Sequence, residues 1–205
     1  MPKTKYGKIS RRFGTPLSAS PSIQKVLSRR SYGPGVQGPK QQQRRRTSTF
    51  GLQLNEKQKA KLLYDIREKQ FRNYYLKAVR RKGNTEQFLV QELESRLDNV
   101  IFRMGFAKTR QQARQLVSHK FFAVNGKGVN IRSFEVRPGD EVSLRDTKTN
   151  KGLIAELKEY AGQRTIPSWL STNPSVLSGR MLSVPEGEDL SGIFDPKLII
   201  EFYSR

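Results

Sequence analysis

Apolar residues recur at helical spacing between Glu68 and Arg81, at positions i, i+3, i+4, i+7 and i+8. These positions hold Phe71, Tyr74, Tyr75, Ala78 and Val79. At about 100° per residue, the opposite side carries Lys69, Asn73, Lys77 and Arg80. The pattern predicts a helix with an apolar seam behind a basic front, in a region that becomes helical at Glu56. That front is either an ordinary solvated face or a surface that follows phosphates.

A second apolar stripe predicts one long helix, from Thr85 beside a Gly-Asn break to the terminating Gly105. Glu92 and Arg96 stand four residues apart, which is the spacing of an ion pair on the exposed side of such a helix. The core side of the helix is formed by Leu89, Leu93, Leu97, Val100, Ile101 and Met104.

A shorter helix is predicted to begin at Arg110, because Thr109 and Gln112 have the spacing of a capping box. Arg110, Arg114 and Ser118 share one face of it, so two guanidinium groups point the same way. Guanidinium groups bind phosphate through two hydrogen bonds and also stack on bases. The inner face is formed by Ala113, Leu116 and Val117.

Strand patterns follow this helix. Residues 121–124 and 129–131 flank Asn125-Gly126, which tolerates the positive φ angles of a hairpin turn. After a turn at Pro138-Gly139-Asp140, residues 141–145 alternate polar and apolar side chains. We expect a further helix through Leu153, Leu157 and Tyr160, a packing role for the single Trp169, and a terminal strand at residues 198–203, Leu-Ile-Ile-Glu-Phe-Tyr.

Charge points to a polyanionic partner. The 205 residues include 39 Lys and Arg against 18 Asp and Glu, a formal charge of +21. Residues 1–50 hold 12 basic and no acidic side chains, whereas five acids and two bases follow from Met181 onward. A phosphate-seeking arm on a folded body accounts for this gradient better than a lipid-binding surface does. The arm has too little apolar surface to order itself, so we expect it to order on RNA.

Several classes of site are excluded by composition. No apolar run approaches the roughly 18 residues of a membrane-spanning helix, so we expect no membrane partner. Without cysteine there is no disulfide, zinc ribbon or thiol nucleophile, and His119 is the only histidine. We therefore expect no metal site and no cofactor, and several classes of enzyme are excluded together; the expectation of no enzyme activity rests on the placement of the Arg96-Leu97-Asp98 motif.

Four motifs, in this order and spacing, resemble the bacterial or organellar type of small ribosomal subunit protein four. They are Arg96-Leu97-Asp98-Asn99-Val100, Phe102-Arg103-Met104-Gly105-Phe106, Ala113-Arg114-Gln115-Leu116-Val117-Ser118-His119 and Val124-Asn125-Gly126. The resemblance extends through residues 68–75 and 201–204. Some relatives carry a cysteine-ligated zinc in the arm, which this chain cannot bind. Asp65 also stands where a glycine is usual, and we expect it to make a helix break continuous.

The resemblance implies a primary rRNA-binding protein. Such a protein grips a multi-helix junction in the 5′ domain of small-subunit (16S-type) rRNA and helps nucleate subunit assembly. It neighbours ribosomal protein five near the channel through which mRNA enters, in a cytoplasmic or organellar ribosome. Matching docking residues are Lys108, Arg110, Arg114, His119, Lys120 and Lys127 in the module and Lys57, Lys69 and Arg72 in the helical part, beside the arm residues Arg11, Arg12, Arg29, Arg30, Arg44, Arg45 and Arg46.

The predicted fold class is α+β, with four segments. They are a basic, disordered-like N-terminal arm (1–50), an all-helical domain (51–93), a small α/β RNA-binding module of two helices and an antiparallel hairpin or sheet (94–157), and a C-terminal segment that packs back on the body (158–205). The α/β module set into a helical protein is implied by the resemblance.

Two other functions use the same features. Pseudouridine synthases carry a similar module and an Arg-Leu-Asp motif with a catalytic aspartate, which Arg96-Leu97-Asp98 resembles. Here the motif lies inside a predicted helix before the module's basic helix, and about 60 residues after Arg145 are too few for the catalytic domain. A free RNA chaperone would need only the charge and the module.

Overall fold

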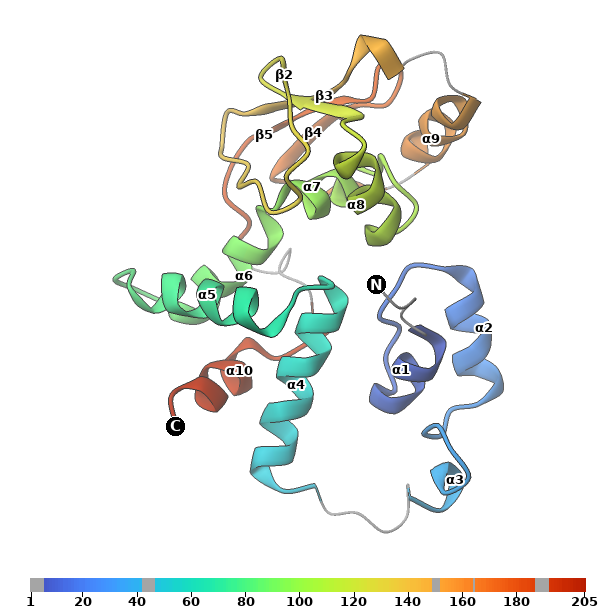
Figure 1. The fold of residues 1–205 in the computed structure, drawn as a ribbon, viewed down its shortest axis with the longest axis vertical. Coiled ribbons are helices and arrows are strands. Elements are labelled where there is room, and N and C mark those ends of the chain that lie inside the picture. Colours follow the sequence, from blue (N-terminus) through green and yellow to red (C-terminus); the bar gives the residue numbers. More distant parts are fainter. Residues whose placement is uncertain (1–5, 42–46, 149–151, 164, 187–191) are drawn as a thin grey trace. The chain divides into compact units, whose positions relative to one another are not determined.

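The computed structural model describes residues 6–41, 47–148, 152–163, 165–186 and 192–205. Contacts group the chain into two compact units. The first comprises Met1–Glu86 and Ser191–Arg205, and the second comprises Gln87–Leu190. Figure 1 shows helices in the first unit and a sheet with helices in the second, which is the predicted α+β class. The boundaries of the four predicted segments stay predictions.

Residues 6–41 of the N-terminal arm contain helices, which corrects the expectation of a disordered-like arm for this part of it. It contains α1 (Tyr6–Phe13), α2 (Pro21–Arg29) and the short α3 (Gly38–Gln41). Tyr6, Leu17 and Ile23 are buried, and α1 packs on α2. The buried Ser10 hydroxyl accepts a hydrogen bond of 3.2 Å from the Leu17 amide. Sparse apolar residues order the arm because two short helices can share them.

The helices α4 (Thr49–Leu63) and α5 (Glu68–Val79) are separate, so the continuous helix expected at Asp65 is wrong. Asp65 adopts a left-handed conformation with φ 48°, although it has a side chain. The Ile66 amide bonds the Lys61 carbonyl at 2.9 Å, which closes the helix end. The helix also begins earlier than Glu56, because the Ser48 hydroxyl caps it by accepting from the Gly51 amide.

The predicted seam of α5 is confirmed at Phe71, Tyr75 and Ala78, which are buried. Val79 departs from it and is 48% exposed.

The chain end is a helix, α10 (Pro196–Tyr203), so the predicted terminal strand is wrong. Asp195 caps the helix by accepting from the Lys197 amide at 2.9 Å, and Pro196 occupies its first turn. These start signals outweigh the strand preference of the β-branched and aromatic residues that follow. The helix packs on α4 and stacks the Tyr203 ring on Tyr75, with centroids 4.8 Å apart.

The long helix predicted over residues 85–104 is instead two helices, α6 (Thr85–Glu94) and α7 (Leu97–Arg103). Arg96 between them is extended and forms an isolated antiparallel bridge with Glu135. The Leu97 amide donates to the Phe134 carbonyl and the Val136 amide donates to the Ser95 carbonyl, both at 2.8 Å. A loop distant in sequence therefore replaces the helical hydrogen bonds. Glu92 and Arg96 are both buried, so the exposed side of the helix expected for them is wrong.

The hairpin is confirmed around Asn125-Gly126, whose φ angles are 49° and 78°. Its strands are β1 (Phe122–Val124) and β2 (Lys127–Gly128), so the return strand lies earlier than residues 129–131. The predicted strand at 141–145 is β3 (Glu141–Leu144). It is followed by a 3-10 turn (Asp146–Lys148) and by α9 (Gly152–Gly162), the helix expected there.

Two later strands, β4 (Leu170–Asn173) and β5 (Ser178–Met181), complete an antiparallel sheet of order β2-β1-β3-β5-β4. The helices α7 and α8 (Arg110–Ser118) lie side by side beneath it in Figure 1. One core joins the sheet to α7, α8 and α9, with Trp169 packed inside it as predicted. Gly179 allows close packing, because an added Cβ there would lie 3.0 Å from the Met104 sulfur.

Candidate nucleic-acid interface

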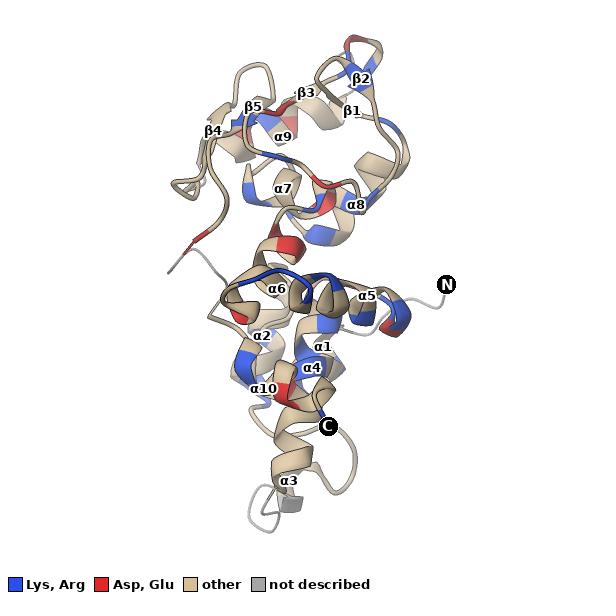
Figure 2. Ribbon diagram, turned by 90° about the vertical axis from the view of Figure 1, so that its left-hand side faces the viewer, with Lys and Arg blue, Asp and Glu red and all other residues tan. Residues whose placement is uncertain are grey.

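The C-terminal end of α8 and the adjoining hairpin present exposed cations on fixed backbone. Thr109 caps α8 by accepting from the Gln112 amide at 3.2 Å, as the capping-box pattern predicts. The helix ends where Lys120 takes a left-handed conformation, φ 54°, and the Phe121 amide bonds the Leu116 carbonyl at 3.0 Å. His119, Lys120 and Lys127 are all exposed. Figure 2 shows Lys and Arg along α8 and on β2.

The side chain of Asn125 supports the hairpin turn. The Asn125 amide nitrogen donates to Asp140 at 2.8 Å, and its oxygen accepts from the Glu141 amide at 2.9 Å, so the hairpin turn is tied to β3. Next to β3, the Arg145 guanidinium lies against Gly128, where an added Cβ would be 3.1 Å from its Nε. Arg145 is therefore a further cation beside Lys127, which the sequence patterns did not single out.

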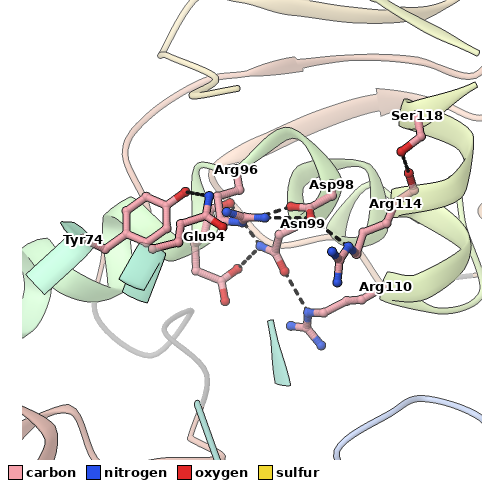
Figure 3. A network of polar contacts seen from close by, with 9 residues as sticks. Tyr74, Glu94, Arg96, Asp98, Asn99, Arg110, Arg114 and Ser118 are labelled. Atoms are coloured by element: carbon pink, nitrogen blue, oxygen red, sulfur yellow. Dashed lines mark hydrogen bonds and ion pairs between the residues drawn. The ribbon is translucent and has the colours of Figure 1, made fainter. Parts of the chain in front are cut away.

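Arg110 begins α8 and is held from α7. Its Nε donates a hydrogen bond of 2.9 Å to Oδ1 of Asn99. Its guanidinium also lies over the Phe102 ring, 4.4 Å from the ring centre. Asn99 in turn donates to the Glu94 carboxylate at 2.6 Å, and Glu94 accepts two hydrogen bonds of 2.8 Å from Arg103. Figure 3 shows Arg110 joined to this network through Asn99.

Arg114 is more deeply placed than its pattern suggested, since its side chain is only 13% exposed. Its Nε lies 3.8 Å from Oδ2 of Asp98. Asp98 also accepts two hydrogen bonds, of 3.1 and 2.9 Å, from the buried Arg96. Arg110 and Arg114 therefore do not form a fully exposed surface of α8. Arg110 is hydrogen-bonded to Asn99 and Arg114 lies close to Asp98.

Asp98 is a structural carboxylate in this arrangement. Burial raises the pKa of Asp98 above its ordinary value, while the charge and hydrogen bonds of Arg96 act in the opposite direction. Only 4% of the residue is exposed, so its carboxylate is not available to a nucleotide in this conformation. This placement argues against the catalytic role that the Arg-Leu-Asp motif has in pseudouridine synthases.

Lys108 precedes α8 and is paired within its own unit. Its ammonium group forms an ion pair with Glu156, and it lies 6.0 Å from the centre of the Tyr160 ring. Glu156 offsets part of the charge that Lys108 would offer to a phosphate.

Of the RNA-binding residues predicted in the helical part of the first unit, two are exposed and one is buried. Lys69 and Arg72 are exposed on α5. Lys57 is only 6% exposed, because its ammonium group lies 2.9 Å from Glu68 and 4.2 Å from the centre of the Phe202 ring. The expectation that Lys57 docks on RNA therefore conflicts with its burial, and we leave it out of the interface.

The helical arm contributes three exposed arginines, which are Arg12, Arg29 and Arg30. Arg11 is partly buried and donates to the carbonyls of Tyr32 and Gly33, each at 3.1 Å. The run Arg44, Arg45 and Arg46 lies outside the described residues.

Comparison with known proteins settles the family. Residues 3–94 match the Ribosomal protein S4/S9 N-terminal domain, and residues 95–142 match the S4 domain. The small ribosomal subunit protein uS4 of Chlorobium limicola is 48% identical over 198 residues, covering 97% of this chain and 96% of that protein. The chain belongs to the uS4 family. The uS4 proteins of Chromohalobacter salexigens and Aquifex aeolicus are 47% and 45% identical, over 97% of this chain and 96% and 95% of their own length.

Membership of the uS4 family confirms the resemblance given by the four motifs. The relatives are named as bacterial small ribosomal subunit proteins, in agreement with the predicted location in the ribosome. Among the described residues, no helix is both long and apolar enough to cross a membrane. Within the same ranges, no three His, Asp or Glu side chains gather as a metal site.

The sequence patterns did not identify the buried residues that support Arg110 and Arg114. Glu94, Asp98 and Asn99 are ordinary positions of the single long helix that the apolar stripe predicts. A signal was available in Glu94 and Asn99, which are polar and adjoin the apolar stripe of the predicted helix. Buried polar groups require hydrogen-bond partners, so such positions indicate a network.

Proposed function

We propose that this chain is a structural constituent of the small ribosomal subunit that binds small-subunit rRNA directly. The observation that carries the proposal is the group of exposed cations held on fixed backbone at the end of α8 and on the hairpin. Lys120 and Lys127 form this group; His119 is exposed next to Lys120, Arg145 lies against Gly128, and the held Arg110 stands at the other end of α8. The family assignment supports the ribosomal role.

The mechanism is recognition of folded RNA by shape. Side chains cannot read base edges in the deep, narrow major groove of A-form RNA. Contacts fall instead on phosphates, 2′-hydroxyls and splayed junction nucleotides. Left-handed Lys120 and the two-residue hairpin turn fix the positions of the cations, so the spacing of phosphates rather than base sequence is matched.

The finer assignment follows the family resemblance. The protein grips a multi-helix junction of the 5′ domain and helps nucleate assembly. It lies beside ribosomal protein five, near the channel through which mRNA enters. Exposed Lys69, Arg72 and the arm arginines Arg12, Arg29 and Arg30 supply further phosphate contacts.

Footprinting tests this assignment directly. The protein is bound to full-length small-subunit rRNA, and backbone cleavage is compared with and without protein. Protection concentrated at one multi-helix junction of the 5′ domain supports the proposal, and protection spread over the molecule or located elsewhere contradicts the junction assignment.

The behaviour of native small subunits distinguishes a subunit constituent from a free RNA chaperone. A subunit constituent stays with small subunits through a high-salt wash, whereas a chaperone washes off while still binding unrelated duplexes. The enzyme alternative is tested with RNA carrying tritium at uridine C5, since pseudouridine formation replaces that hydrogen. We expect no tritium release.

A further inference from the structure

We infer that Asn99 is a positioning residue that fixes the guanidinium of Arg110 for RNA binding. The inference rests on the proposed function, because it concerns how the binding surface is held. Asn99 is 2% exposed and cannot itself reach RNA in this conformation. Its oxygen accepts the hydrogen bond from Arg110 Nε at 2.9 Å, so it acts through another side chain.

The chemistry of this position calls for an amide. On one side Asn99 must accept from a guanidinium, and on the other it must donate to an acceptor. Its nitrogen lies 2.6 Å from Oε2 of Glu94 and 3.0 Å from the Glu94 backbone carbonyl. A carboxylate there would place a second negative charge against Glu94, and an apolar side chain could do neither. The asparagine therefore has a defined orientation in which its oxygen faces Arg110.

Glu94 makes that orientation rigid. Its side chain is fully buried, and Arg103 holds the carboxylate through two hydrogen bonds of 2.8 Å. The result is a chain of charge-assisted contacts from Arg103 through Glu94 and Asn99 to Arg110, as Figure 3 shows for its last three members. A buried network whose members are held on both sides resists reorientation.

Phe102 supplies a second constraint on the same guanidinium. Phe102 is 4% exposed, and the centre of its ring lies 4.4 Å from Arg110 Cζ. The hydrogen bond through Nε sets the direction of the group, and the ring sets its plane. In Figure 3 the far end of Arg110 extends away from Asn99.

Holding the Arg110 guanidinium in place before RNA binds should change the affinity by a measurable amount. Immobilising a flexible side chain at an interface weakens affinity by about three- to tenfold, and an arginine that is already ordered avoids that loss. A direct guanidinium–phosphate contact contributes about tenfold or more. Loss of Asn99 should therefore weaken binding less than loss of Arg110, and only while Arg110 is present.

A double-mutant cycle tests this dependence. Filter binding compares the full-length chain with its Asn99→Leu, Arg110→Ala and doubly substituted variants, using a transcript of the rRNA 5′ domain. We expect losses of about threefold or more for Asn99→Leu and about tenfold or more for Arg110→Ala. The double variant should lie within about twofold of Arg110→Ala alone. Losses that multiply would overturn the inference, because a general weakening of the module would act with or without Arg110.

Two further variants separate positioning from stability. Gln91→Leu removes another buried amide of the same unit, one that bonds the Pro185 carbonyl at 3.3 Å and makes no contact with Arg110. It should leave affinity unchanged. Phe102→Leu removes the ring beneath Arg110, and its loss should also vanish in the Arg110→Ala background. This second cycle decides the matter if Asn99→Leu does not fold, and multiplicative losses there overturn the inference.

Failure of the inference differs from failure of the proposed function. If the unsubstituted chain shows no preference for the 5′-domain transcript over an unrelated duplex of equal length, the proposed function fails. If it shows that preference while the Asn99 cycle is multiplicative, or the Phe102 cycle where Asn99→Leu does not fold, only the positioning of Arg110 fails.

Discussion

The ammonium group of Lys57 donates a hydrogen bond of 2.9 Å to the carboxylate of Glu68, which joins α4 to the first turn of α5. Glu68 also accepts from Lys61 at 3.1 Å and from the Tyr203 hydroxyl at 2.7 Å, so α10 shares the same carboxylate. A lysine that resembles an RNA contact in the sequence thus connects three helices of its own unit.

Lys57→Met should destabilise the first unit by about 1–2 kcal/mol. The value is below that of a fully buried ion pair, because the Glu68 side chain is 45% exposed and keeps two other partners. Hydrogen exchange of the α4 and α5 amides measures the change. Lys69→Met is the matched control, since Lys69 is exposed on α5. It should leave exchange unchanged while weakening RNA binding, and the reverse pattern would contradict this division of roles.

The same carboxylate should make the stability of the first unit depend on pH. Partial burial acts to raise the pKa of Glu68, but hydrogen bonds from Lys57, Tyr203 and Lys61 lower it from 4.5 to about 2. Because the pKa is lower in the folded state, the contribution is complete above about pH 4.5 and is lost as the pH falls towards 2. The stability difference between the unsubstituted chain and Glu68→Gln should therefore shrink across that interval. Hydrogen exchange or chemical unfolding at several pH values measures it, and a constant difference would exclude the mechanism.

Lys120→Asn should remove one phosphate contact without disturbing α8. Asparagine tolerates the left-handed conformation that Lys120 adopts, so the helix end is retained. Binding should weaken similarly for all RNA sequences, and the slope of log affinity against log salt should fall by about one. Filter binding over a salt series provides the measurement. Lys197→Ala, an exposed lysine of α10 outside the proposed interface, should leave the slope unchanged.

Gly128→Ala should displace the Arg145 guanidinium, because the added Cβ would lie 3.1 Å from Nε and 3.2 Å from Cζ. The flexible arginine can move, so we expect a stability change below about 1 kcal/mol. RNA affinity should fall about as much as it does in Arg145→Ala, and the two losses should not multiply. Full affinity in Gly128→Ala would show that the placement of Arg145 over the hairpin has no role in binding.

Local chemistry accounts for what the sequence predicted well. The Thr109 cap, the Asn125-Gly126 turn and the Gly105 helix end are each set by steric and hydrogen-bonding preferences that act over a few residues. The sequence also placed the basic helix and hairpin in one module. It did not reveal which of the module's polar residues lie behind the surface, since burial depends on residues that the chain brings together from a distance.

By itself, the sequence determined the charge of the protein, its α+β class, its hairpin turn and the basic residues from which an RNA-binding surface can be built. Tertiary structure decided which cations remain exposed. Lys57 is buried because α5 and α10 pack against α4, and Arg96 leaves the helix because a loop near Val136 takes over its neighbours' hydrogen bonds. Residues 198–203 form a helix rather than a strand because Asp195 and Pro196 start one that packs on α4. Free energies of packing and hydrogen bonding between distant segments exceed the small local preferences that a sequence pattern expresses.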